Sequence, residues 1–522
     1  MLGFHRRTRS LIPVKDLGKY DKVELNEEDY DTDEEDMEEY NVTIEAAPAK
    51  RKQRQLTLIY VIFLAEAIMA SSLQPQLKML ISNEDFCGSL STSYLRSILD
   101  CAYAFGGTAG IFWGYLADRI GRRPVALMGL FAMSFCCLGM GFATDVVSCT
   151  IFRFVAGLSS STIVVTTLTM IGDISVGHAE RAKNVARLPL IALCGSIGPI
   201  MQGMVSGSIE ATGAIWQQFP ILSSQITCGS LVFLIAVTSC IMLNETLPMQ
   251  PSKPLAIDID SEKAAFLNQD LLSPSIHIVD LDTPRPLPIS ISAFLRAPSL
   301  LVLISSFSLL SLHASVFDTL LPHLGHSSTS HGGLGIPCSW LGLTVLLVRG
   351  VAGLCILRTI PTAVEKMGLL SPYRALSMLF PAVYIVTPLL AIIVAFSPSL
   401  TALISTAAIL IKHALAGSAS VLVALLILNT TPDSFSTGTV VGLMQVANLF
   451  KALAVAVSGA SFYLSSDYSV ATTNYALWAV LVAFGAVGAA LAWFVRERPS
   501  VERDFPAEVL CWETCFDADG EL

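Results

Sequence analysis

Long apolar runs recur along this chain of 522 residues, with short polar segments between them. An α-helix needs about 20 consecutive apolar residues to cross the hydrocarbon core of a bilayer. Inside lipid every backbone N–H and C=O must be paired within the protein, which restricts spanning structures to helices and closed barrels. With 53% hydrophobic and 14% charged residues, the chain also has too few polar side chains to cover a water-soluble surface. We therefore predict an all-α, polytopic membrane protein.

Twelve runs are long enough to span the membrane, six in each half of the chain. The first six are expected at 57–80, 98–117, 124–143, 148–172, 187–208 and 226–243. The second six are expected at 299–321, 338–360, 375–396, 400–428, 438–463 and 473–495. Two six-helix halves suggest a duplicated transporter with its binding site near the middle of the membrane.

Basic residues predict which side each loop occupies, because loops rich in Arg and Lys stay in the cytoplasm. Residues 50–54 carry four basic side chains directly before the first run, and residues 119–123 carry three more two crossings later. The loop Gly177–Asn184 adds Arg181 and Lys183 on the same side. An even number of crossings then places both termini in the cytoplasm.

The polar segments divide the chain into five parts. Twelve acidic residues lie between Asp21 and Glu39, in a region with few large apolar residues, which predicts disorder. Arg358, Lys366 and Arg374 flank the loop after helix 8, where the second half should repeat the basic loop that follows helix 2. The predicted parts are an acidic cytoplasmic tail (1–54), a six-helix half (55–243), a cytoplasmic linker (244–298), a second half (299–495) and a cytoplasmic tail (496–522).

Glu66 is the acidic residue that lies deepest in the first-half helices. Nine residues into the first run, it should lie about 14 Å deep, near the middle of a core of about 30 Å. A carboxylate in that environment costs several kcal/mol unless it faces a cavity or a partner, and it could exchange a proton near neutral pH. Alternatively, Glu66 is permanently paired with a base on another helix.

Other polar residues inside the runs are candidates for the wall of a central cavity. Arg153 stays charged at any accessible pH, so it cannot carry a proton but could influence a nearby carboxylate or hold an anionic group. Alternatively, it extends to the lipid headgroups. A basic set in the second half would favour anionic or polar substrates, although some members could instead pair with Glu66, and His413 could simply be a packing residue. The cavity candidates in that half are Arg349, Lys412, His413, Gln445 and Lys451.

Helix 5 contains glycines three and five residues apart and a proline, which suit close helix packing and a bend. The residues are Gly195, Gly198, Pro199 and Gly203.

Several other functions have little support in the sequence. Nucleic acid is an unlikely partner for a chain of net charge −10. His323, His326 and His331 fall in one loop, but their spacing matches no rigid metal site. No nucleophile and base pair occurs within the helices, so we expect no enzyme activity, no catalytic residue, no metal and no cofactor.

The segment Gly114-Tyr-Leu-Ala-Asp-Arg-Ile-Gly-Arg-Arg-Pro124 resembles the loop between helices 2 and 3 of the major facilitator superfamily. Other segments resemble the fungal drug:proton antiporter branch, which is related to zinc-induced-facilitator-like and tetracycline-exporter-like proteins. They are Arg153 with Gly157, Gly198-Pro199 with Gly203, Asn244–Pro248, Gly332–Gly335 and Gly438–Gln445. The resemblance covers residues 55–497, but Gln202 and Ala454-Val455 depart from the usual glycine and Gly-Pro positions.

The resemblance implies a monomeric proton-coupled exporter of a small organic molecule, embedded in the plasma or vacuolar membrane. Its partners would be the substrate, protons and the lipid bilayer. In this family the Asp and Arg of the loop after helix 2 make contacts that are present when the cytoplasmic side is closed. The implied gating residues are Gly114, Asp118, Arg119, Gly121, Arg122 and Arg123, and the implied proton-coupling residues are Glu66 and Arg153. A proton symporter, a uniporter and a membrane sensor that does not transport remain alternatives.

Overall fold

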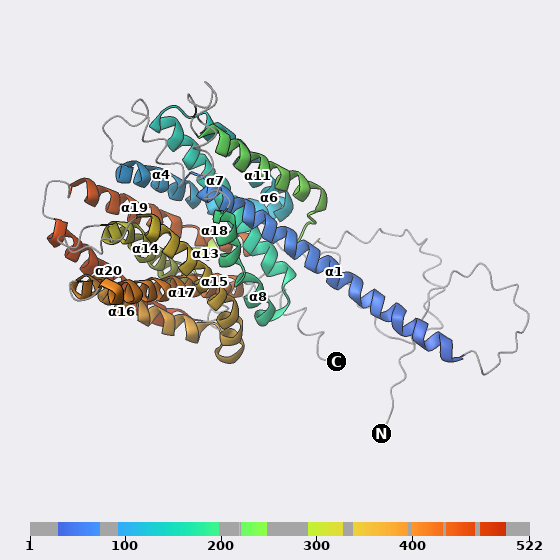
Figure 1. The fold of residues 1–522 in the computed structure, drawn as a ribbon. Coiled ribbons are helices and arrows are strands. Elements are labelled where there is room, and N and C mark those ends of the chain that lie inside the picture. Colours follow the sequence, from blue (N-terminus) through green and yellow to red (C-terminus); the bar gives the residue numbers. More distant parts are fainter. Residues whose placement is uncertain are drawn as a thin grey trace, which may run out of the picture. The chain divides into compact units, whose positions relative to one another are not determined.

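The computed structural model contains helices as its regular elements within the residues that it describes (Figure 1). These residues are 30–73, 92–197, 219, 221–247, 291–326, 338–394, 398–431, 435–464 and 470–496. The chain divides into two compact units, Met1–Arg54 and Gln55–Leu522. The predicted all-helical class is confirmed, and the transporter is built within the second unit.

The predicted first-half helices lie close to the observed ones. Helix 2 is interrupted by a short 3-10 turn, η3 (Gly107–Ala109), which separates α4 from α5. Helix 5 starts with α8, which covers the segment expected as a loop, and residues 188–197 are also helical. The remaining bounds are α1 (Tyr30–Ser71), α4 (Thr92–Gly106), α5 (Gly110–Ile120), α6 (Arg122–Gly141), α7 (Val146–Ile174), α8 (Gly177–Val185) and α11 (Leu222–Met242).

The second half repeats this arrangement. Helix 11 is interrupted at Gln445–Val446, which separates α18 from α19. A short α13 (Ile291–Phe294) precedes the first long helix. The long helices are α14 (Pro298–His326), α15 (Cys338–Met367), α16 (Leu370–Val394), α17 (Pro398–Thr430), α18 (Thr437–Met444), α19 (Ala447–Leu464) and α20 (Val470–Phe494).

Helix α1 begins earlier than the apolar run predicts. It starts at Tyr30, so residues 30–49, for which the composition predicts disorder, are helical. Extending an existing helix adds one hydrogen bond per residue without a new nucleation cost. The Glu-rich sequence of this segment also favours helix.

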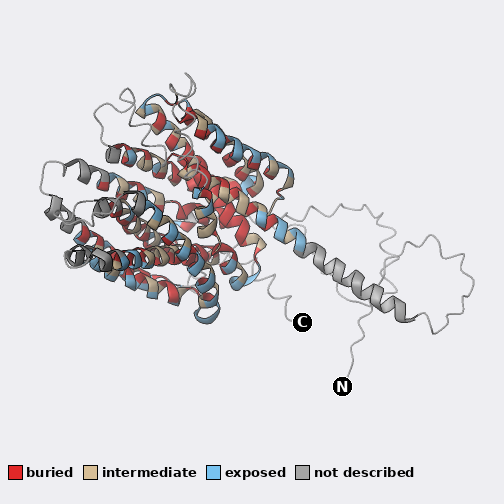
Figure 2. Cartoon of the chain, in the orientation of Figure 1, coloured by how far each residue is buried: buried red, intermediate tan, exposed pale blue. Residues whose placement is uncertain are grey.

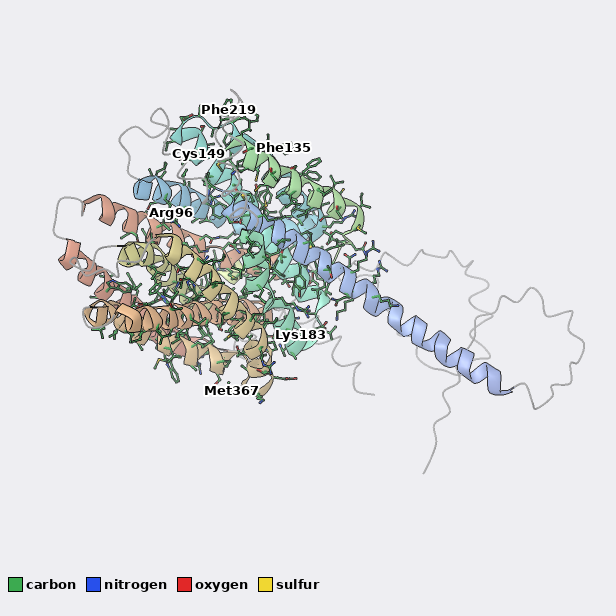
Figure 3. All side chains as sticks on the ribbon, in the orientation of Figure 1. Arg96, Phe135, Cys149, Lys183, Phe219 and Met367 are labelled. Carbon is green, nitrogen blue, oxygen red and sulfur yellow. The ribbon has the colours of Figure 1, made fainter. Side chains whose placement is uncertain are left out.

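Burial and exposure agree with a protein surrounded by lipid. A continuous buried cluster of apolar side chains runs through both halves (Figure 2). Large apolar side chains also face outward, among them Phe135, which is 65% exposed (Figure 3). Eight helices of the described residues are long and apolar enough to cross a membrane. Outward-facing apolar side chains at this density suit lipid contact.

The basic loops of the two halves perform the same structural task. In the first half Arg123 donates to the carbonyl of Cys240 near the end of α11, at 2.7 Å. In the second half Arg374 donates to the carbonyls of Ala492, Trp493 and Val495 at the end of α20. Cations stabilise helix C-termini because the last carbonyls lack partners there. The predicted repeat of charge thus corresponds to a repeated contact.

Helices 2 and 11 bring the two halves together along most of their length. Helices α4 and α5 pack against α19 and α18, respectively. Glycine makes this approach possible, because a Cβ on Gly114 would lie 2.0 Å from the carbonyl oxygen of Gly438. A Cβ on Gly442 would likewise lie 2.5 Å from the carbonyl oxygen of Gly110. We call this contact the glycine seam, and the end of the bundle with residues 114–124 the hinge end.

Candidate functional site

Glu66 is held by side chains from two other helices. Its Oε1 accepts hydrogen bonds from the Tyr103 hydroxyl of α4 at 3.0 Å and from the Ser160 hydroxyl of α7 at 2.6 Å. Within the described part of the chain, no basic side chain lies within 4.0 Å of this carboxyl group, although Lys451 interacts with it electrostatically. Glu66 is therefore not locked in a close ion pair there.

The two hydroxyl groups suit both protonation states of Glu66. A hydroxyl can donate to a carboxylate and can accept a hydrogen bond from a carboxylic acid. After protonation, Tyr103 or Ser160 can reverse its role by rotating its hydroxyl hydrogen. Neither state then leaves a buried polar group unpaired, which would cost about 1–3 kcal/mol.

Arg153 lies behind this carboxyl group and is 2% exposed, so it does not extend to the lipid headgroups. It donates to the carbonyl of Ala70 at 2.9 Å, where α1 ends, and lies 3.9 Å from Asp100. Its guanidinium group also stacks over the Tyr103 ring at 4.4 Å from the centroid. Because Tyr103 donates to Glu66, the structure connects the two predicted proton-coupling residues through one shared side chain.

The predicted gating residue Asp118 reaches across to the other half at the hinge end. Its carboxylate accepts from the backbone N–H groups of Gly438 at 2.8 Å and Thr439 at 2.6 Å. It also accepts from the Thr439 hydroxyl at 2.7 Å. These donors lie at the start of α18, where free N–H groups and the helix dipole stabilise a negative charge. Asp118 therefore links the two halves at the hinge end in this structure.

The arginines that follow Asp118 fix the loop to its own half. Arg122 is fully buried and forms an ion pair with Asp173 of α7. Glu245 accepts from the backbone N–H of Arg122 at 2.9 Å and of Arg123 at 3.1 Å, at the start of α6. Arg119 lies over the Tyr115 ring and makes none of these contacts.

Gly121 has a specific conformational reason to be glycine. Its backbone φ angle is 104°, which residues with a side chain rarely adopt. A Cβ there would also lie 2.5 Å from a Glu245 carboxylate oxygen. Of the six predicted gating residues, Gly114 and Asp118 thus contact the opposite half. Gly121, Arg122 and Arg123 shape the loop.

The breaks in helices 2 and 11 face each other. Asn448 donates to the carbonyl of Gly107 at 3.2 Å and to Gln445 Oε1 at 2.8 Å. A Cβ on Gly110 would lie 2.2 Å from the Gln445 side chain. Gln445, a predicted cavity residue, is buried in this seam.

The second half contains an ion pair at membrane depth. Lys412 of α17 is 1% exposed and pairs with Oδ1 of Asp318 on α14. Its ammonium group also lies 3.4 Å from the carbonyl oxygen of Ala314 and over the Phe317 ring. Asp318, in contrast, is 40% exposed. Lys412 is therefore neutralised within its own half.

The other predicted cavity residues lie around this pair. Arg349 and His413 interact electrostatically with Asp318. Lys451 interacts with both Asp318 and Glu66. Arg349 and Lys451 are exposed, whereas His413 is half-buried. Charged residues of both halves thus lie close enough to one another to interact electrostatically.

Some predicted residues lie elsewhere or outside the described part. Gly195 packs against α1, where its Cβ would lie 2.5 Å from that of Ala67. Gly198, Pro199, Gly203 and His331 are outside the described residues, as are the side chains of His323 and His326. Among the described residues no cluster of three His, Cys, Asp or Glu side chains could hold a metal ion.

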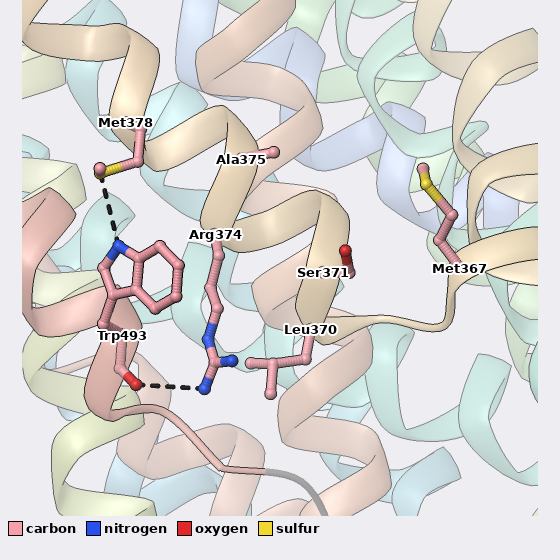
Figure 4. Close-up of a pocket in the computed structure, with 7 residues that line it drawn as sticks. All are labelled: Met367, Leu370, Ser371, Arg374, Ala375, Met378 and Trp493. Carbon is pink, nitrogen blue, oxygen red and sulfur yellow. Dashed lines mark hydrogen bonds between the residues drawn. The ribbon is translucent and has the colours of Figure 1, made fainter.

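A separate surface pocket of about 470 Å³ lies where α20 ends (Figure 4). Arg374 lies in it, with its guanidinium group 5.4 Å from the centroid of the Trp493 ring. The Trp493 indole donates to the sulfur of Met378 at 3.5 Å. Because the carbonyls of α20 already hold Arg374, this pocket belongs to the helix end and not to the charged space between the halves.

Sequence reasoning missed the partners of the predicted residues. Tyr103, Ser160 and Asp173 are ordinary polar residues of apolar helices, and no sequence pattern connects them with Glu66 or Arg122. Asp318 carries a signal that could have been found, since an acid within the run 299–321 is as costly in lipid as Glu66.

Comparisons with known proteins agree with this architecture. Residues 56–456 match the family model of the Major Facilitator Superfamily. The chain is 24% identical to the multidrug transporter mfsB of Aspergillus fumigatus, over 70% of each chain. It is 24% identical to ZINC INDUCED FACILITATOR 1 of Arabidopsis thaliana, over 78% of this chain and 84% of the relative.

Solved structures show the same fold. The proton:xylose symporter XylE superposes with a TM-score of 0.60 at 15% identity, covering 88% of this chain and all of XylE. The human organic anion transporter MFSD10 superposes with a TM-score of 0.56 at 17% identity, covering 84% of this chain and 99% of MFSD10. The chain is therefore a member of the Major Facilitator Superfamily, a multi-pass membrane transporter and not an enzyme.

Proposed function

We propose that this transporter exports a small organic molecule in exchange for protons, by alternating access of one site to the two sides of the membrane. The proposal rests on the environment of Glu66. Its carboxyl group accepts from Tyr103 and Ser160, and no base lies within 4.0 Å of it among the described residues. It can therefore gain and lose a proton without breaking an ion pair.

Arg153 and Lys451 position this group without neutralising it. Arg153 orients Tyr103 from behind, and Lys451 acts from the opposite half. In the exchange cycle, a proton would enter from the end of the bundle opposite the hinge end, while Asp118 holds the hinge end closed. Breaking the Asp118 contacts with α18 would then expose Glu66 to the cytoplasm, where the proton leaves.

Export is the direction suggested by the relatives. The name of mfsB describes a multidrug transporter, and another relative is called the efflux pump azaK. The basic loops at the hinge end favour a cytoplasmic location for that end and for both termini. We propose the plasma or vacuolar membrane as its location, which a fluorescent fusion would identify.

The test is the Glu66→Gln variant of the purified protein in vesicles, over a panel of candidate compounds. Gln retains the hydrogen-bonding shape but cannot titrate. We expect loss of accumulation driven by a pH gradient, while exchange of substrate across the membrane, which needs no net proton movement, is retained. Asp145→Asn is the matched control, because this carboxyl group is in the same half and caps α7 at an exposed position.

Thermal stability of the same variant separates coupling from structure. A coupling role predicts a melting temperature within a few degrees of the wild type. A structural role predicts a large loss of stability, because the environment of Glu66 would lose a required charge. Full pH-driven transport by Glu66→Gln would remove Glu66 from the mechanism. If the wild-type protein instead accumulated substrate in the same direction as the proton flow, it would be a symporter.

A further inference from the structure

Asp318, Arg349 and Lys451 are exposed charged side chains within the membrane-spanning helices of the second half. Asp318 is 40% exposed, although its neighbour Phe317 is fully buried. Arg349 and Lys451 are also exposed. An ionised side chain at this depth has to face water or a partner, since contact with lipid is too costly. These three side chains therefore face water or a partner and not lipid, and Lys451 also interacts electrostatically with Glu66 of the other half.

Asp318 is held so that part of its carboxylate remains available. The ion pair and hydrogen bond from Lys412 both use Oδ1. Lys412 itself is buried and is held by the carbonyl of Ala314 and the Phe317 ring. The exposed edge of Asp318 can therefore contact a bound molecule, while Lys412 holds the other side of the carboxylate in place.

Arg349 and Lys451 offer positive charge beside this carboxylate. Neither has a carboxylate within 4.0 Å in the part of the chain that the structure describes, although both interact electrostatically with Asp318. Each guanidinium or ammonium group has several hydrogen-bond donors for an acidic group. This group of side chains thus presents both signs of charge to a ligand.

We propose that Asp318, Arg349 and Lys451 form a ligand-anchoring site for molecules that carry both an ammonium and an acidic group. A purely anionic ligand would leave the exposed edge of Asp318 without a donor, and a purely cationic one would leave Arg349 and Lys451 without an acceptor. A zwitterion satisfies both signs. The inference rests on the proposed transport function and specifies the substrate class of the same pathway.

Binding to the purified full-length protein tests this assignment without any pH gradient. The probes are propyl, phenylethyl and indolylethyl compounds, each as the amine, the carboxylate and the corresponding amino acid, with binding followed by tryptophan fluorescence and thermal shift. We expect at least one amino acid to bind ten or more times tighter than both of its singly charged relatives. If no amino acid does so, the assignment of the ligand class is wrong.

Variants that remove a charge test whether the named residues cause the preference for amino acid probes. Asp318→Asn should reverse the preference in favour of the carboxylate probe. Arg349→Gln and Lys451→Gln should favour the amine. Lys366→Gln, which removes an exposed lysine from the same helix as Arg349, should leave the preference unchanged.

The outcomes distinguish this site from the proton proposal. Unchanged preferences in both Asp318→Asn and Arg349→Gln would overturn the site, and because Arg349 is exposed, its variant should fold. Loss of proton coupling in Glu66→Gln does not affect a preference that is measured at one pH. A retained zwitterion preference with no pH-driven transport would therefore refute only the proposed function.

Discussion

Replacing Asp118 by asparagine should open the hinge end of the bundle. The carboxylate accepts three hydrogen bonds from Gly438 and Thr439, at 2.6 to 2.8 Å, across the contact between the halves. Asparagine keeps one acceptor oxygen but replaces the other with an NH2 group that faces N–H and O–H donors. The variant also removes the negative charge from the start of α18.

The structure gives the size of this effect. A hydrogen bond to a charged group contributes about 1.5–3 kcal/mol net. A charge at a helix N-terminus contributes about 0.3–1 kcal/mol, and up to about 2 when partly buried. Loss of one such bond and of the dipole interaction removes roughly 2–4 kcal/mol from the closed state. Because 1.4 kcal/mol is about tenfold, the ratio of closed to open molecules should fall by roughly 30 to 1,000 times.

Distances between spin labels would measure this shift. Cysteines introduced at His178 and Lys366 in an otherwise cysteine-free chain carry the labels, because both positions are exposed and belong to different halves. We expect one short distance in the wild type and an added, longer and broader distribution in Asp118→Asn. Turnover should fall with little change in substrate affinity, whereas Asp145→Asn should leave the distances unchanged.

Two results would refute this reasoning. Identical distance distributions in the wild type and Asp118→Asn would mean that the contacts with α18 do not hold the closed state. Loss of substrate binding without any change in the distances would assign Asp118 to recognition and not to gating. Arg122 should remain paired with Asp173 in either case, so collapse of the loop is not expected to obscure the result.

Three further predictions follow from the same contacts. Gly114→Ala should shift the label distances in the same direction as Asp118→Asn, because its Cβ would lie 2.0 Å from the carbonyl oxygen of Gly438; unchanged distances would show that the seam adjusts. Arg374→Gln should lower stability by about 1–3 kcal/mol, measured as a lower melting temperature, because three carbonyls of α20 lose a charged donor. Epitope tags at both termini should be cytoplasmic, and the Asn-x-Thr sites at Asn41 and Asn429 should carry no glycan in a mobility assay; a glycan at either site would contradict the predicted topology.

The helices could be predicted from the sequence because lipid imposes a simple rule on length and polarity. The breaks in helices 2 and 11 could not be predicted in this way. Gly107 and Gln445 lie within continuous apolar runs, and hydropathy is insensitive to a single altered turn. The breaks depend on a contact between distant segments, in which Asn448 supplies a donor to the carbonyl of Gly107.

The candidate site was predictable in its charged members and not in their environment. Depth in an apolar run identified Glu66, and the basic Gly-Asp-Arg pattern identified Asp118. The hydroxyls of Tyr103 and Ser160 were not identified, because a sequence does not say which face of one helix meets which face of another. The hydrogen bonds that hold the Glu66 carboxyl group depend on those faces.

The second half shows why charges have to be considered as a set. Taken alone, Arg349, Lys412 and Lys451 predict a strongly positive cavity and anionic substrates. The position of an acidic residue deep in an apolar run identified Glu66, and the same criterion identifies Asp318. Including Asp318 changes the expected substrate class. Lys412 is buried against that carboxylate, so its charge is compensated before any ligand arrives. What remains accessible is the exposed edge of Asp318 together with the cations Arg349 and Lys451, and a ligand that satisfies all three has to carry both signs.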